Sequence, residues 1–300
     1  MKRCTSVLVG FVCAVCTLNL GCNYKRMVIN SSYLMVEEAT FAFYEETDTQ
    51  LAKEAAPANL KLVEGMARGA PDNVEVLLAA SQLIGMYAFG FLEDSTDDEN
   101  SQEMANARAA RLYFRAFNYA SAALQQRADF AHMMAMDISD FENALKEYDE
   151  EDVPGLFWAA FNFGLYINMS RADLSAIAQM SKVQAMAKRV IALDESYFYG
   201  GAHLILMVYN GVLGPTLGGS PAKTKKAYYR ASSLSNETFL MTRYLYARYY
   251  CVQTQNRWLF EKLLKDILDA PDDLLASQAL SNALAKEKAQ RLLAKADDLF

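Results

Sequence analysis

Histidine and cysteine are scarce in this 300-residue chain. The two histidines, His132 and His203, lie far apart in the sequence and cannot form the H-E-x-x-H motif of zinc proteases. Beyond Cys22 the only cysteine is Cys251, so a structural zinc site lacks ligands and the mature protein should contain no disulfide. The nucleophile-elbow motif G-x-S-x-G is also absent. We therefore predict a protein that is not an enzyme, with no catalytic residue, no metal and no cofactor.

Basic residues are outnumbered, with 29 Lys and Arg against 36 Asp and Glu and a net charge of −7. A nucleic-acid-binding surface must neutralise phosphates with a basic stripe. The charge balance therefore argues against nucleic acid as a partner.

Proline is infrequent and sustained period-2 alternation of apolar residues is missing, while helical periodicity recurs. Phe260, Leu263, Leu264, Ile267 and Leu268 follow the i, i+3, i+4, i+7, i+8 pattern of one helix face. The chain should be all-α.

Five prolines stand where helical segments should begin, as expected for proline in a first helical turn. They are Pro57, Pro71, Pro154, Pro221 and Pro271.

The helical segments recur at a regular distance. Leu193, Leu234 and Leu268 hold matching places in successive segments, and Leu124 lies about two intervals before Leu193. Leu234 and Leu268 are separated by the period of the tetratricopeptide (TPR) repeat, which is about 34 residues. The interval from Leu193 to Leu234 is longer because it contains a glycine-rich segment. We predict an α-solenoid of degenerate TPR-like helix hairpins; the alternative is an unrelated helical bundle with chance spacing.

The N-terminus has the features of an exported lipoprotein. Lys2 and Arg3 precede an apolar run that is too short to span a membrane, and the run ends in "LNLGC" at Cys22. This ending resembles a lipobox, although the aliphatic residue (Leu18) lies one position further from the cysteine than usual. We expect a signal peptide over 1–21, a lipidated tether over 22–34 beginning at Cys22, and one helical domain over 35–300. The alternative is ordinary secretion with an unmodified Cys22.

The segment "GPTLGGSPAKT" (214–224) has the glycine spacing of a phosphate-binding loop. Ser220 and Pro221, however, occupy the places where that loop needs Lys and Ser or Thr. Ser followed by Pro is typical of an N-cap and a first helical residue. We therefore predict a turn, with Lys223 and Thr224 inside the next helix.

Two acidic stretches, "EDSTDDEN" (93–100) and "EYDEEDVP" (147–154), lack the central glycine of a calcium loop. Both are expected to be solvated loops.

Three segments together resemble the TatT family of TPR lipoproteins associated with TRAP (tripartite ATP-independent periplasmic) transporters. They are "VPGLFWAAFNFGLYIN" (153–168), "LDESYFYGGAHLILMVYNGVLGPTLGGSPAKTKKAYYRASSLS" (193–235) and "LYARYYCVQTQNRWLFEKLLKDILDAP" (245–271). The resemblance covers about residues 35 to 271, and the C-terminal segment after it is typical of a generic amphipathic helix.

The resemblance implies a periplasmic protein anchored to a bacterial membrane, the inner membrane being favoured. It implies docking to a periplasmic TRAP substrate-binding protein and assembly as a homo-oligomer, a trimer being expected. A cavity or pore holding a small hydrophobic or carboxylate ligand is implied as well. The alternatives are a TPR lipoprotein of outer-membrane assembly or glycan capture, and a helical enzyme acting on the cell wall.

Aromatic and amide side chains in the family-like segments are the candidate contacts for a ligand or partner, because aromatic residues make strong anchors. The alternative is that they belong to the helical core. They are Trp158, Asn162, Asn168, Tyr197, Tyr199, His203, Tyr209, Tyr244 and Tyr246.

Overall fold

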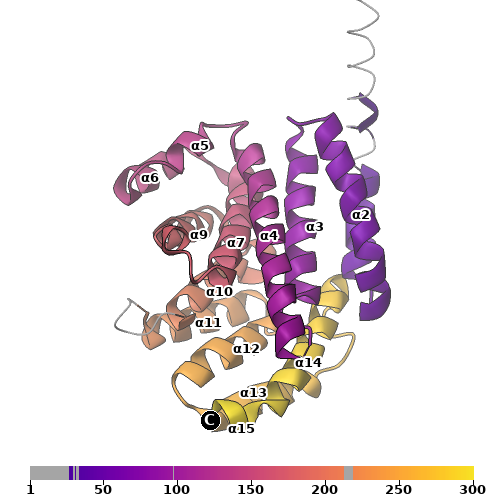
Figure 1. Cartoon of the computed structure of the whole chain (residues 1–300), viewed down its shortest axis with the longest axis vertical. Coiled ribbons are helices and arrows are strands. Elements are labelled where there is room, and N and C mark those ends of the chain that lie inside the picture. Colours follow the sequence, from indigo (N-terminus) through magenta and orange to yellow (C-terminus); the bar gives the residue numbers. More distant parts are fainter. Residues whose placement is uncertain (1–26, 30, 32–33, 97, 213–218) are drawn as a thin grey trace, which may run out of the picture.

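The chain is an array of helices that pack mainly against their neighbours in sequence (Figure 1). The structure is a computed structural model that describes residues 27–29, 31, 34–96, 98–212 and 219–300. No strand occurs among these residues, so the predicted all-α class is confirmed. The predicted signal peptide and Cys22 lie outside the described residues.

The principal helices are α2 (Thr49–Gly69), α3 (Val74–Phe91), α4 (Glu99–Leu124), α7 (Val153–Met169), α9 (Met180–Asp194), α10 (Tyr197–Val212), α11 (Pro221–Leu234), α12 (Met241–Tyr246), α13 (Arg257–Leu268) and α14 (Ala279–Ala294). Shorter helices are α5 (Phe130–Met133), α6 (Ile138–Ala144), α8 (Leu174–Ile177) and α15 (Ala296–Leu299). Turns of 3-10 helix lie at Leu145–Glu147, Glu150–Asp152 and Ala276–Gln278, and a π-helical turn, η4, follows α12 at Ala247–Cys251.

Side-chain caps determine where several helices begin. Asp48, Asn73, Asp98, Ser220 and Asn256 each accept a hydrogen bond from a backbone N–H in the first turn of the helix that follows. These bonds satisfy amides that have no partner within the helix.

The predicted turn before α11 is confirmed on the described side of the loop. The backbone N–H of Lys223 donates to Ser220 Oγ at 3.3 Å, Pro221 is the first helical residue, and Thr224 is buried within the helix. Residues 213–218 lie outside the described part of the chain.

The predicted repeat positions coincide with helix ends. Leu124, Leu234 and Leu268 are the last residues of α4, α11 and α13, and Leu193 is the second-last residue of α9. The periodic leucines therefore lie at or next to the C-terminal ends of helices.

The proline expectation is only partly right. Pro154 and Pro221 lie in first turns, whereas Pro71 and Pro271 lie between helices and start none. Pro57 lies inside α2, well beyond the first turn. A proline in a helix interior removes one hydrogen bond, but the capped start and the buried face of this long helix outweigh that loss.

The C-terminal helix makes contacts outside its own hairpin. α14 packs beside α13 and also against α12 and the lower end of α2 (Figure 1). Thr49 Oγ1 donates to Glu287 Oε1 at 2.5 Å across 238 residues of sequence. In an open solenoid each repeat contacts only its neighbours. Here the last long helix also contacts the first part of the array.

Helix α3 is the one described helix long and apolar enough to cross a membrane, but 61% of it is buried inside the protein.

Helix α3 is crossed by α7 at a close approach. Asn162 on α7 donates from Nδ2 to Ser81 Oγ at 3.0 Å, and a Cβ placed on Gly85 would overlap Asn162 Oδ1. A side chain at residue 85 would therefore displace the Asn162 amide from the place where the two helices meet.

Replacing Gly85 by alanine should lower the free energy of unfolding by about 1–3 kcal/mol, because the added methyl overpacks the α3–α7 crossing. Gly65→Ala is the matched control, since an added Cβ at this exposed residue of α2 meets nothing within 4 Å. That variant should gain about 0.5–1 kcal/mol from helix propensity. Urea unfolding of both variants checks the prediction, and equal effects of the two substitutions would contradict it.

Candidate functional site

An apolar cavity of about 110 Å³ lies among helices α3, α7, α9, α10, α12 and α14 and the turn η4. Its wall is mostly hydrocarbon and aromatic ring, and Asn168, Tyr209, Tyr249 and Ser281 add polar groups. None of the lining residues carries a charge. Representative apolar lining residues are Phe89, Phe161, Leu165, Met180, Phe198, Leu204, Val208, Leu245 and Leu284.

An irregular turn at the start of α10 shapes one wall of this cavity. Phe198, Tyr199 and Gly200 are consecutive residues in the left-handed region, with φ of 46°, 59° and 74°. This conformation costs about 1–3 kcal/mol for each non-glycine residue. The Phe198 ring offsets part of that cost by packing edge-on against Trp158, with ring centroids 5.1 Å apart. The turn thus directs an aromatic ring into the cavity wall.

The π-helical turn η4 shapes another part of the wall. Turns of this kind insert one extra residue into a helix and are frequent at functional sites. Here Tyr249 lines the cavity, while Tyr246 stacks between Tyr228 and Tyr250, with ring centroids 3.9 and 4.5 Å apart. Within this turn Tyr249 faces the cavity while its neighbour Tyr250 belongs to the tyrosine stack.

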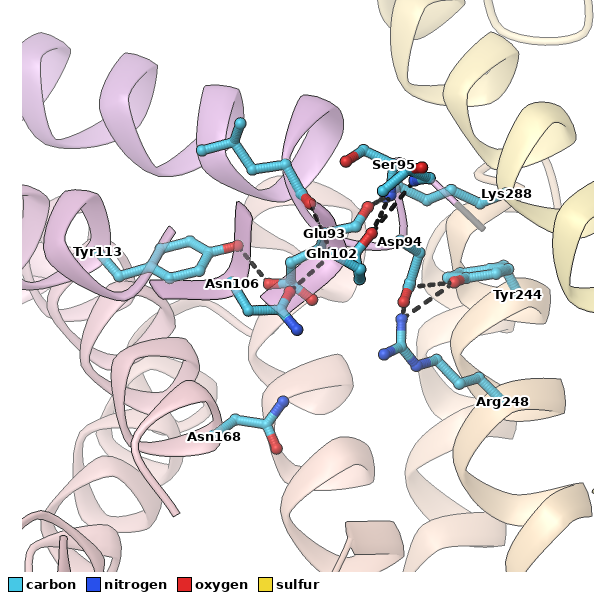
Figure 2. Close-up of polar contacts among 12 residues, drawn as sticks. Glu93, Asp94, Ser95, Gln102, Asn106, Tyr113, Asn168, Tyr244, Arg248 and Lys288 are labelled. Atoms are coloured by element: carbon cyan, nitrogen blue, oxygen red, sulfur yellow. Dashed lines mark hydrogen bonds and ion pairs between the residues drawn. The ribbon is translucent and has the colours of Figure 1, made fainter. Parts of the chain in front are cut away.

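A buried polar network lies next to the cavity at the C-terminal end of α3 (Figure 2). Glu93 accepts a hydrogen bond from Tyr113 Oη on α4, and the Glu93 carbonyl oxygen accepts one from Lys288 Nζ on α14. Glu93 and Lys288 are 2% and 1% exposed. The Lys288 ammonium also lies 5.6 Å from the ring centroid of Phe89, a cavity residue. The network therefore joins α3, α4 and α14 directly beside the cavity wall.

A second set of contacts ties the same loop to α12 and η4 (Figure 2). Asp94 forms an ion pair with Arg248, and Tyr244 Oη donates to Asp94 Oδ2 at 2.8 Å. Gln102 on α4 completes the loop, because its Nε2 donates to the Leu92 carbonyl at 3.0 Å and its Oε1 accepts from the Ser95 backbone N–H at 2.8 Å. Glu93 is thus part of the interior, whereas Asp94, whose side chain is 34% exposed, is held at the surface by its partners.

The expectation of a solvated loop over 93–100 is therefore wrong for Glu93, and Asp94 is only partly solvated. Glu93 is buried and Asp94 is held by Arg248 and Tyr244, because the loop folds under α12 and α14. Sequence spacing does not reveal which acidic residues another part of the chain will cover.

Burial shifts the pKa of several groups in and near the network. Desolvation lowers the pKa of Lys288 to about 7, against an opposing effect of the Glu93 charge. Desolvation also raises the pKa of the buried Tyr113 and Tyr244 hydroxyls and raises the pKa of the Cys251 thiol to about 12. At neutral pH the single described cysteine is therefore a thiol and not a nucleophilic thiolate.

The predicted binding residues do not form one cluster. Asn168 and Tyr209 line the cavity, and Arg171 donates to Asn168 Oδ1 at 2.6 Å. Trp158 and Asn162 are 1% and 0% exposed and belong to the core behind it, where Asn162 Nδ2 also donates to the Trp158 carbonyl at 2.9 Å.

The remaining predicted residues lie around the cavity without lining it. Tyr197 packs on the core residue Phe157, and Tyr199 stacks on Phe239 and shares a hydrogen bond of 3.0 Å with Ser277. Tyr244 belongs to the polar network and Tyr246 to the tyrosine stack. His203 lies in a separate groove between α9 and α11.

Sequence reasoning missed the charged residues Glu93, Asp94, Arg248 and Lys288, and most of the apolar lining. An acidic pair directly after the apolar run of α3 was the available signal for Glu93 and Asp94. No signal distinguishes Lys288 from the other lysines of its helix, because its burial depends on the return of α14 to the end of α3.

Lys288 should make stability depend on pH. Its folded-state pKa of about 7 lies below the ordinary 10.5, so between these values the unfolded chain binds a proton that the folded chain does not. The free energy of unfolding of the natural protein should therefore rise with pH relative to Lys288→Met, by about 1–3 kcal/mol between pH 7 and 9.5. Urea unfolding at both pH values measures this difference. Lys53→Met, at an exposed residue of α2, is the control. A stability difference between the natural protein and Lys288→Met that does not change with pH would contradict the lowered pKa of Lys288.

Comparison with known proteins gives a family and a relative. The model of the TRAP transporter T-component family (TAtT) matches residues 45–300. The chain is also 23% identical to an uncharacterized protein of Treponema pallidum (strain Nichols), over 100% of this chain and 99% of that protein. The family match includes α14 and so extends past residue 271, where the sequence resemblance was expected to stop. The family is a transporter component and not an enzyme family. With a match over most of its length, this chain belongs to the TRAP transporter T-component family.

Proposed function

We propose that this T-component is a lipid-anchored periplasmic protein that docks a TRAP substrate-binding protein and holds a small apolar ligand in its central cavity. The uncharged, mostly apolar cavity is the observation that carries the ligand proposal. Membership of a transporter-component family supports the docking proposal.

The chemistry of the wall favours a hydrophobic ligand over a carboxylate at this site. No lysine, arginine or histidine is among the described residues that line the cavity, so a carboxylate would lack a counter-charge there and would enter at a large desolvation cost. An apolar cavity of about 150 Å³ is known to bind benzene. This cavity, at about 110 Å³, is smaller but of the same order, so the proposed ligand is at most the size of a small aromatic or short aliphatic molecule.

Membrane attachment is proposed to occur through Cys22, at the start of the tether that precedes the helical domain. With Lys2 and Arg3 removed in the signal peptide, 27 basic residues remain against 36 acidic ones. A surface of this charge has no electrostatic attraction to anionic lipid, so acyl chains would supply the attachment. Homo-oligomerisation, with a trimer as the expected number, is part of the same proposal.

No specific observation favours either alternative function. A cell-wall enzyme would need a placed catalytic carboxylate, whereas Glu93 is held in a structural network. Outer-membrane assembly and glycan capture receive no support from the family assignment.

Docking is tested by co-purification from native membranes with identification of the bound protein. The expected result is a TRAP substrate-binding protein that remains bound after detergent extraction. Cys22→Ala separates anchoring from docking: this variant should lose acyl labelling and leave the membrane, yet still retain the partner. Absence of any such partner at micromolar protein concentration would contradict docking, and surviving acyl labelling would contradict the anchor.

Ligand binding in the cavity is tested with toluene as the probe. Toluene should raise the melting temperature of the natural protein in a concentration-dependent way, because a ligand that binds only the folded state stabilises it. Val208→Phe places a larger side chain in the cavity and should abolish the shift. Val74→Phe makes the same change at an exposed residue of α3 and should leave it intact. Equal melting-temperature shifts in both variants would mean that toluene binds outside the cavity.

A further inference from the structure

Exposed apolar side chains are concentrated near the N-terminus of the described chain, away from the cavity and the polar network. Seven of the fifteen exposed large hydrophobic residues in the described part lie within residues 27–62, and the other eight are scattered along the rest of the sequence. Clustered apolar surface marks a site of contact with a protein or a membrane. Six of the seven, named here the N-terminal apolar face, are Met27, Val28, Leu34, Met35, Phe41 and Leu62.

Helical residues 34–44 bury one side and leave the other in solvent. Val36 belongs to a buried cluster with residues of α2 and α3, and Gln82 Nε2 on α3 donates to Tyr44 Oη. Val36 and Tyr44 are eight residues apart, the spacing of two positions on one face of an amphipathic helix. The exposed surface of this segment therefore faces away from the protein. Its large apolar residues are Leu34, Met35 and Phe41.

The exposed side of α2 continues this face. A Cβ on Gly69 would overlap Ile29 Cδ1, so the N-terminal residues pack on the side of α2 that holds Gly69. Leu62 lies seven residues before Gly69, which places it on the same side of the helix, and it is 61% exposed. Helix α2 lies at an edge of the array (Figure 1), and this side is open to solvent.

The short chain before the face indicates which surface it contacts. Cys22, the proposed acylation site, precedes Met27 by five residues. An extended chain spans at most about 3.6 Å per residue, so acylation of Cys22 would hold Met27 within about 18 Å of the lipid. Lys25 and Arg26 lie within this interval and place two positive charges next to the lipid phosphates. The apolar face thus begins at the membrane.

We propose that the N-terminal apolar face contacts the lipid surface and fixes the orientation of the helical domain on the membrane. The proposal rests on the proposed acylation of Cys22. Glu38 lies between Leu34 and Phe41 on the exposed side, so the face lies in the headgroup region, as interfacial amphipathic helices do. Four glutamates within residues 37–46 give this segment no attraction to anionic lipid, so the contact is apolar. The acyl chains hold the protein at the membrane, and the face determines which side of the domain points toward it.

Fluorescence quenching of the full-length lipidated protein in phosphatidylcholine vesicles tests the proposal. Met35→Cys provides one attachment site for a nitrobenzoxadiazole dye, because Cys22 is acylated and Cys251 is buried. Aqueous iodide should quench this label roughly threefold less on vesicles than in the soluble Cys22→Ala protein, because lipid headgroups cover it. Leu174→Cys, at an exposed residue of α8, is the control and should be quenched equally in both.

A charge introduced into the face tests its contribution. Leu34→Glu should restore iodide access to a dye at Phe41→Cys while the protein stays on the vesicles, because the acyl chains still hold it. Leu34 is exposed, so the melting temperature should not change. Leu174→Glu makes the same change outside the face and should leave the dye protected. Protection should also be independent of salt concentration, since screening weakens charge contacts and not apolar ones.

The outcomes separate this proposal from the anchor on which it rests. A protein that does not float with the vesicles would show that the acyl anchor is wrong, and the membrane contact with it. A protein that floats while its Met35 label is as accessible as in solution would leave the anchor intact and overturn the membrane contact. If the label is already protected in the soluble Cys22→Ala protein and becomes accessible on dilution, a second copy of the chain covers the face and the lipid proposal is wrong.

Discussion

The contact between Lys288 on α14 and the end of α3 is the constraint on which the rest of the structure depends. The side-chain nitrogen of a lysine that is 1% exposed needs a hydrogen-bond partner, and the carbonyl of Glu93 provides one. This contact holds the C-terminal helix against the beginning of the array, 195 residues away in sequence. Residues of both α3 and α14 line the cavity, so this contact helps to shape its wall.

The cavity also depends on two departures from regular helix. The left-handed residues before Gly201 aim Phe198 at the cavity, and the π-helical turn does the same for Tyr249. Regular helices packed at close distance would fill this space with side chains. Strained backbone persists only where surrounding packing overdetermines it, and the aromatic contacts of Phe198 with Trp158 supply such packing here. Left-handed backbone thus shapes one wall of the space that could hold a ligand, although other left-handed residues (Asp94, Asn236, Glu237 and Gln255) lie outside that wall.

The apolar cavity and the α9–α11 groove differ in chemistry as well as place. The central cavity excludes charge and suits an apolar ligand, while Lys188, Lys223 and Lys226 line the groove. Helix α10 separates them, with Leu204 facing the cavity and Leu206 facing the groove. One helix therefore contributes to both sites through different faces, as the 3.6-residue period allows.

The sequence by itself determined the local features of this protein: its helical class, the repeated leucine positions, the Ser220 cap before α11 and the family resemblance. These features depend on residues close together in the chain, and local spacing therefore predicts them. Pro57 inside α2, the buried Glu93 and the core positions of Trp158 and Asn162 were decided only by tertiary structure. The burial of Glu93, Trp158 and Asn162 depends on helices that are distant in sequence. The tolerance of Pro57 depends on the stability of α2 as a whole. The N-terminal apolar face was also decided by tertiary structure, because whether a side chain is buried, paired or exposed is determined by what packs against it.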